Sequence, residues 1–142
     1  MKKRVVPVLL SILLCACTSI QVSPVDSSIK LGHVCIKKNT KVIIHDFVDV
    51  LEDGLARHDV TTELFSGKEA PENCAYILTY TATRKWDMAP FLAYAQLYIK
   101  DKEGNTIASA RYDHHGGLDF GKWAGTAEKM DPVIDRLFAE VE

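Results

Sequence analysis

The sequence predicts an α/β domain, a two-layer sandwich in which two helices cover one face of a mainly antiparallel sheet in the order β-α-β-β-β-β-α. Two observations carry this prediction. Several segments in the middle of the chain alternate apolar and polar residues, which is typical of half-buried strands. Two other segments repeat apolar residues every three or four positions, as amphipathic helices do. One helix lies between strands and the other follows the last strand, so both helices fit on the same face.

The first half of the domain predicts one strand and one helix. The strand is expected over residues 33–37, and a helix over 42–57 follows it, with Asn39 and Thr40 supplying the cap. Gly54 weakens this helix by about 1 kcal/mol relative to alanine. The buried stripe of the helix is expected to consist of Ile44, Phe47, Val48, Leu51 and Leu55.

The second half predicts a meander of strands and a closing helix. Strands are expected over residues 60–65, 75–85, 91–100 and 106–114. The last helix begins at or before Asp131-Pro132, with Thr126 as an alternative start. The sheet face away from the helices is expected to stay uncovered; it carries threonines together with Tyr94, Gln96, Tyr98 and Arg111.

The N-terminal segment has the layout of a secretory signal. Three cations at residues 2–4 precede a short apolar run, and small residues follow it. The run is far shorter than the roughly 20 apolar residues that cross a bilayer, so it indicates export, with a buried N-terminal helix as the alternative. The segment Leu14-Cys15-Ala16-Cys17 resembles the lipobox of bacterial lipoproteins, which implies a diacylglycerol on Cys17 and added acyl chains such as palmitate. By the same resemblance, Thr18 favours the outer membrane.

These features divide the chain into three parts. Residues 1–16 are expected to be a signal peptide, residues 17–30 the lipidated Cys17 with a flexible tether, and residues 31–142 a single globular domain. The apolar residues Ile20, Val22 and Val25 alternate within the tether, which leaves open that it docks as an edge strand.

Charge and cysteine content limit the classes of partner. After removal of the leader the chain keeps 14 basic and 19 acidic residues, a net charge of −5, which argues against nucleic-acid binding. The acyl chains are therefore expected to provide the attachment to the membrane. Cys35 and Cys74 remain as an even pair in an oxidising compartment and are predicted to form a disulfide, with two buried free thiols as the alternative.

A resemblance extends over nearly all of the mature chain. It is carried by the lipobox and by segments at Val34-Cys35-Ile36, 46–54, 78–87 and 122–135. With these segments the sequence resembles a family of small proteobacterial envelope lipoproteins. The resemblance implies a location in the cell envelope and names no activity.

The sequence contains none of the common local signatures of catalysis: no nucleophile elbow, zinc-protease motif, phosphate loop or dinucleotide fingerprint. We therefore expect that the protein is not an enzyme and uses no cofactor. Asp113-His114-His115 is the most suggestive cluster, because neutral imidazoles bind zinc or copper. Adjacent strand residues point to opposite faces, however, so a solvated strand end is the simpler interpretation.

Large aromatic residues indicate a candidate partner surface. Trp86 and Trp123 flank the longest loops, and Tyr94 and Tyr98 lie on the face expected to be uncovered. The alternative is that both tryptophans seal the edge of the sheet. The sequence predicts a periplasm-facing outer-membrane lipoprotein with a non-enzymatic accessory or interaction role, whose partner is an envelope protein or a glycan. The alternative function is metal binding through His114 and His115.

Overall fold

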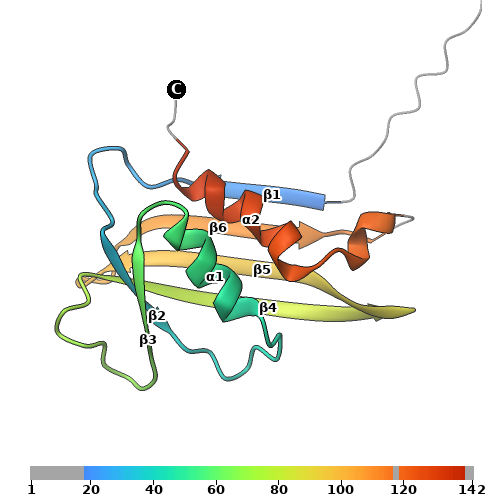
Figure 1. The fold of residues 1–142 in the computed structure, drawn as a ribbon, viewed down its shortest axis with the longest axis horizontal. Helices are drawn as coiled ribbons and strands as arrows, with labels where there is room; N and C mark the ends of the chain where they lie inside the picture. The colour runs from blue at the N-terminus through green and yellow to red at the C-terminus, as the bar shows by residue number, and fades with distance from the viewer. Residues whose placement is uncertain (1–17, 117–118, 140–142) are drawn as a thin grey trace, which may run out of the picture.

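A computed structural model describes residues 18–116 and 119–139, and its centre is a six-stranded mixed sheet (Figure 1). The strand order across the sheet is β1-β6-β5-β4-β2-β3. The strands are β1 (Thr18–Ser23), β2 (His33–Lys37), β3 (Thr61–Phe65), β4 (Tyr76–Asp87), β5 (Ala89–Asp101) and β6 (Thr106–His114).

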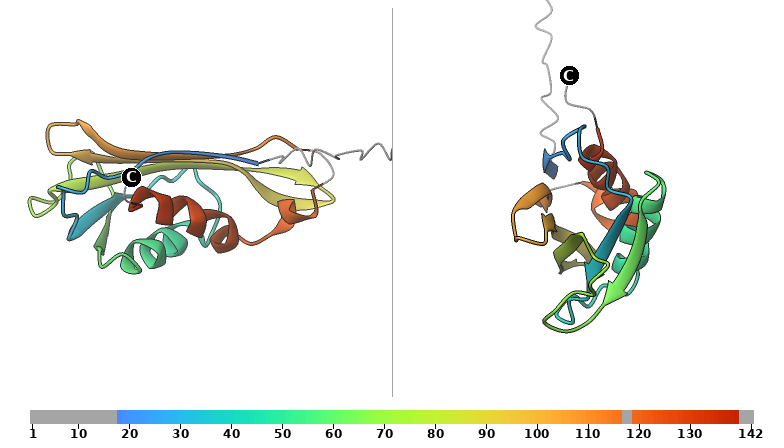
Figure 2. Two further views of the ribbon diagram at one scale, coloured as in Figure 1. Left: turned by 90° about the horizontal axis from the view of Figure 1, so that it is seen from above. Right: turned by 90° about the vertical axis from the view of Figure 1, so that its left-hand side faces the viewer.

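Two helices lie side by side on one face of this sheet, and none of the described helices covers the other face (Figure 2). They are α1 (Phe47–Ala56) and α2 (Thr126–Leu137), and a short 3-10 helix, η1 (Phe120–Trp123), precedes α2. The predicted fold class, with its order of strands and helices, is confirmed.

Pairing divides the sheet into two regions. β4, β5, β6 and β1 are antiparallel neighbours, and β4 and β5 pair along their whole length. β2 is parallel to both β3 and β4, and it pairs with β4 only at Cys35 and Ile36. The β2–β4 pair is therefore the shortest, and the weakest, pair of neighbouring strands in the sheet.

The segment expected to be a flexible tether is different in the structure. Thr18–Ser23 forms the edge strand β1, which pairs with β6 from Thr18↔His114 to Ser23↔Ser109. Ile20 and Val22 pack against the core, and Val25 and Leu31 are buried. The alternating apolar residues therefore dock this segment on the sheet, the alternative that their spacing had left open.

α1 is shorter than the sequence predicts, whereas α2 has the earlier start at Thr126 that the sequence left open. α1 begins at Phe47 rather than near residue 42, because Asn39 is used in the preceding loop and not as a helix cap. α2 begins at Thr126 and continues through Pro132. Pro132 lies inside α2, where it has no backbone N–H to donate to the Glu128 carbonyl one turn earlier.

The core lies between the helices and the sheet. Phe47, Leu51 and Leu55 of α1 and Val133, Ile134 and Leu137 of α2 are almost fully buried. They pack against the inward side chains of the long strands, and the Phe47 ring stacks on Tyr80 with ring centroids 5.4 Å apart. Among the described residues, no helix has the length and apolar character needed to cross a membrane.

Candidate binding site on the uncovered sheet face

The uncovered side of the sheet, here called the open face, is polar. Its side chains alternate along the strands with the apolar ones that enter the core, as the sequence predicts. Tyr98 is 38% exposed, and in the described part of the chain no helix covers this face (Figure 2). The open face includes Gln21, Thr79, Thr81, Thr83, Tyr94, Gln96, Tyr98, Ser109 and Arg111.

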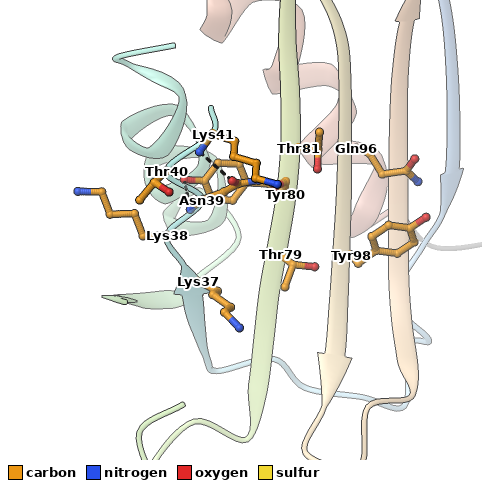
Figure 3. Close-up of a pocket in the computed structure, with 10 residues that line it drawn as sticks. All are labelled: Lys37, Lys38, Asn39, Thr40, Lys41, Thr79, Tyr80, Thr81, Gln96 and Tyr98. Carbon is orange, nitrogen blue, oxygen red and sulfur yellow. Dashed lines mark hydrogen bonds between the residues drawn. The ribbon is translucent and has the colours of Figure 1, made fainter. Parts of the chain in front are cut away.

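A pocket of about 360 Å³ lies on the open face, where the loop after β2 runs beside β4 and β5 (Figure 3). The loop contributes the run from Lys37 to Lys41. The strands contribute Thr79, Tyr80 and Thr81 from β4, and Gln96 and Tyr98 from β5. Its volume is in the range that holds a small ligand.

Asn39 fixes the loop against β4. Its backbone N–H donates to the Tyr80 hydroxyl at 3.2 Å, and its side-chain amide donates to the Tyr80 carbonyl at 2.9 Å. Its side-chain oxygen accepts from the backbone N–H of Lys41 at 3.1 Å, which closes a tight turn. The wall of the pocket is therefore held in place before any ligand arrives.

Charge in the pocket has one sign. Lys37, Lys38 and Lys41 line it, and no carboxylate does among the described residues. The Lys37 and Lys41 side chains extend toward β4, whereas Lys38 points away from the sheet (Figure 3). In a protein with more acidic than basic residues, this local excess of cations favours an anionic ligand.

The strand side of the pocket supplies uncharged donors and acceptors. The Tyr94 hydroxyl donates to Gln96 Oε1 at 2.6 Å, which orients the Gln96 amide and leaves its N–H₂ group to donate to a ligand. Thr79, Thr81 and Tyr98 add three hydroxyl groups beside it. This set suits a ligand that has several hydroxyl groups as well as a negative charge.

Trp86 and Trp123, which the sequence assigned to the candidate partner surface, lie away from the pocket. They are at the end of the molecule where β4 turns into β5. Trp86 is 76% exposed, and Trp123 of η1 is 37% exposed. The Trp123 indole Nε1–H donates to the carbonyl of Asp87 at 2.8 Å. The predicted partner surface is therefore divided, with Tyr94 and Tyr98 on the open face and both tryptophans at the end of the sheet.

The two candidate metal ligands, His114 and His115, face different surroundings. His114 is 3% exposed, and its Nδ1 lies 3.2 Å from Thr18 Oγ1. His115 is exposed, and its Nε2 lies 3.2 Å from Ser19 Oγ. Because Thr18 and Ser19 are consecutive residues of one strand, their side chains point to opposite faces. This arrangement does not favour a single ion held by both rings.

Two buried lysines, Lys122 and Lys129, lie near His114. Burial lowers the pKa of His114, and the Lys129 ammonium strengthens this effect. Lys129 donates to the carbonyls of Leu92 and Lys122, and burial lowers its pKa as well. Within the described part of the chain, His114 Nε2 is a buried side-chain atom without a hydrogen-bond partner. The buried His114 ring therefore packs edge-on to Phe91, with no described partner for Nε2.

The predicted disulfide between Cys35 and Cys74 is present and joins β2 to the residues just before β4. Ligand atoms of His33, Cys35 and Glu63 lie close enough together to be considered as a metal site. The disulfide occupies the Cys35 sulfur, however, which leaves only His33 and Glu63. Cys17, the predicted lipidation site, lies outside the described residues.

Comparisons with known proteins show the fold alone. No protein-family model matches this sequence, and no curated protein matches it. Among solved structures, the chain is similar to a PelC variant, a dodecamer, from Paraburkholderia phytofirmans. The two chains are 14% identical, the match covers 81% of this chain and 97% of that chain, and the TM-score is 0.51.

Proposed function

We propose that this protein is a lipoprotein anchored to the bacterial outer membrane, facing the periplasm, and that it binds an acidic saccharide in the pocket on its open face without catalysing a reaction. The leader and the lipobox that ends at Cys17 support the location. The observation that carries the binding role is the pocket, where Lys37 and Lys41 stand opposite Thr79, Thr81 and Gln96.

The chemistry of the pocket matches both parts of such a ligand. Lysine ammonium groups attract a carboxylate, sulfate or phosphate on the sugar. Hydroxyl and amide groups both donate and accept, so they pair with sugar hydroxyl groups. Tyr98 adds a half-exposed ring beside them, an apolar surface for the face of a sugar.

Replacing Lys37 and Lys41 together by alanine is expected to weaken binding of an acidic oligosaccharide at least tenfold, because each lysine offers a charge-assisted hydrogen bond to the anion, worth about 1.5–3 kcal/mol. Isothermal titration calorimetry measures this change. Binding by the unaltered protein is also expected to weaken as salt is raised, since the lysines are partly exposed to solvent.

Lys38→Ala is the matched control, since it removes the same charge from the same loop but from a side chain that points away from the sheet. It is expected to weaken binding less than either Lys37→Ala or Lys41→Ala. Equal affinity for acidic and neutral oligosaccharides of one size, or unchanged affinity in the double variant, would show that the pocket does not have this role.

A further inference from the structure

Exposed apolar side chains gather at one end of the domain. The turn between β4 and β5, the helix η1 and the start of β1 lie together there (Figures 1 and 2). We call this region the hairpin end. It carries four of the seven large apolar side chains that are exposed in the described residues. They are Trp86 at 76%, Met88 at 84%, Phe120 at 88% and Trp123 at 37% exposure.

Polar contacts hold the parts of the hairpin end together. Lys122 of η1 pairs with Asp87, the last residue of β4, and the Trp123 indole donates to the Asp87 carbonyl. One ring nitrogen of His114, Nδ1, lies 3.2 Å from Thr18 Oγ1 and 3.9 Å from the Asp119 carboxylate. The exposed apolar side chains therefore project from an end of the sheet whose segments are held together by these contacts.

Met88 is held in an unfavourable backbone conformation at the tip of this region. Its φ is 58°, in the left-handed region, while Asp87 and Ala89 on either side of it are paired with each other. A residue other than glycine in this conformation costs about 1–2 kcal/mol. The turn thus keeps an exposed methionine where glycine fits better, which indicates a use for the side chain.

The predicted acyl chains also leave the domain at this end. Cys17 directly precedes Thr18, the first residue of β1, and consecutive Cα atoms are about 3.8 Å apart. β1 is held to β6 from Thr18 onward, so no tether separates the anchor from the sheet. A lipid on Cys17 therefore brings the hairpin end against the bilayer.

We propose that the hairpin end is a membrane-contact surface, on which Trp86, Met88, Phe120 and Trp123 enter the headgroup layer beside the acyl chains of Cys17. This inference rests on the proposed lipidation. Tryptophan is enriched at the membrane–water interface, because its ring is apolar and its N–H is polar. Arg84 and Lys85 are exposed next to Trp86, form no salt bridge with a described residue, and suit lipid phosphates.

This orientation stands the sheet upright on the membrane. β5 has 13 residues and rises about 3.3 Å per residue, so the β5–β6 turn lies roughly 40 Å from the hairpin end. The pocket on the open face then faces sideways into the periplasm, clear of the bilayer.

Tryptophan quenching by brominated lipids tests the proposal in the full chain, made with its leader in a bacterial host and reconstituted into vesicles of phosphatidylethanolamine and phosphatidylglycerol. Trp123→Phe leaves Trp86 as the reporter, and Trp86→Phe leaves Trp123. A control chain carries both changes and Glu103→Trp, which places the sole indole on the β5–β6 turn. Both native tryptophans are expected to be quenched several-fold more strongly than the control indole.

A second variant separates membrane contact from folding. Met88→Gly with Phe120→Ser removes two apolar side chains and relieves the positive φ, so it is expected to melt no lower than the unaltered protein. The quenching of Trp86 is nevertheless expected to fall several-fold in this variant.

The outcomes distinguish this proposal from the proposed function. Equal quenching of all three indoles in a chain whose mass shows an acylated Cys17 overturns the membrane contact alone. A mass without acyl chains overturns the lipoprotein proposal and the contact together. Trp86 could instead become shielded from solvent when copies of the chain associate, without being quenched by brominated lipid. That result would assign the hairpin end to an interface between copies of the chain and would contradict the membrane contact.

Discussion

Replacing Cys35 and Cys74 together by alanine is expected to lower the free energy of unfolding by about 4 kcal/mol, because the disulfide closes a loop of 39 residues in the unfolded chain. The bond also crosses the place where the sheet is weakest, since β2 pairs with β4 only at Cys35 and Ile36. Both cysteines are buried beside Phe65, so the alanines leave apolar surroundings intact.

Thermal unfolding monitored by circular dichroism measures this effect, and a fall in melting temperature of roughly 10–20 °C is expected. Dithiothreitol is expected to lower the melting temperature of the unaltered protein similarly and to leave the double-alanine variant unchanged. Free thiols at both positions in protein exported to the periplasm would contradict this interpretation.

Replacing Gly54 by valine is expected to destabilise the domain by about 3 kcal/mol, near the upper end of the usual cost of overpacking. Gly54 is buried where α1 crosses α2. A Cβ at this position would lie 2.5 Å from Ile134 Cδ1 and 3.0 Å from its Cγ2. Ile134 is itself fully buried, so its side chain has little room to move.

Gly54→Ala shows which physical effect dominates. Helix propensity alone predicts a gain of about 1 kcal/mol for this change. The contact with Ile134 predicts a loss instead, and adding Ile134→Val, which removes Cδ1, is expected to recover part of it. Urea denaturation of both variants tests this, with Ala56→Gly at an exposed position of α1 as the control for propensity. A more stable Gly54→Ala protein would show that close helix packing does not require the glycine.

Local patterns in the sequence were sufficient to predict most of the fold. Alternation along β4, β5 and β6 identified the strands and assigned Tyr94 and Tyr98 to the open face. The apolar stripes identified both helices. The role of Gly54 did not follow from α1 alone, because it depends on Ile134 in a helix 80 positions away in the sequence.

The elements that differ from the sequence prediction depend on contacts between distant parts of the chain. β1 is short and rich in serine, and its partner β6 lies nearly a hundred residues later. Asn39 has the residue type of a helix cap, but its side chain bonds to Tyr80 of β4 and closes a loop. In both cases a tertiary partner decided between alternatives that the local sequence left open.

The pocket was missed for the same reason. The run from Lys37 to Lys41 is visible in the sequence, but its position beside Thr79 and Gln96 requires the parallel pairing of β2 with β4. The tryptophans were identified by exposure in long loops. That Trp86 and Trp123 lie at the same end of the sheet as Thr18, the residue after Cys17, follows only from the strand order and from the contact of Trp123 with Asp87.

Both the proposed location and the proposed membrane contact depend on a lipid attached to Cys17. Intact-mass analysis of the protein purified from its own host tests this attachment most directly. The predicted result is a chain that begins at Cys17 and carries the mass of a diacylglycerol with its acyl chains. A chain that still begins at Met1, or a Cys17 without lipid, would contradict it.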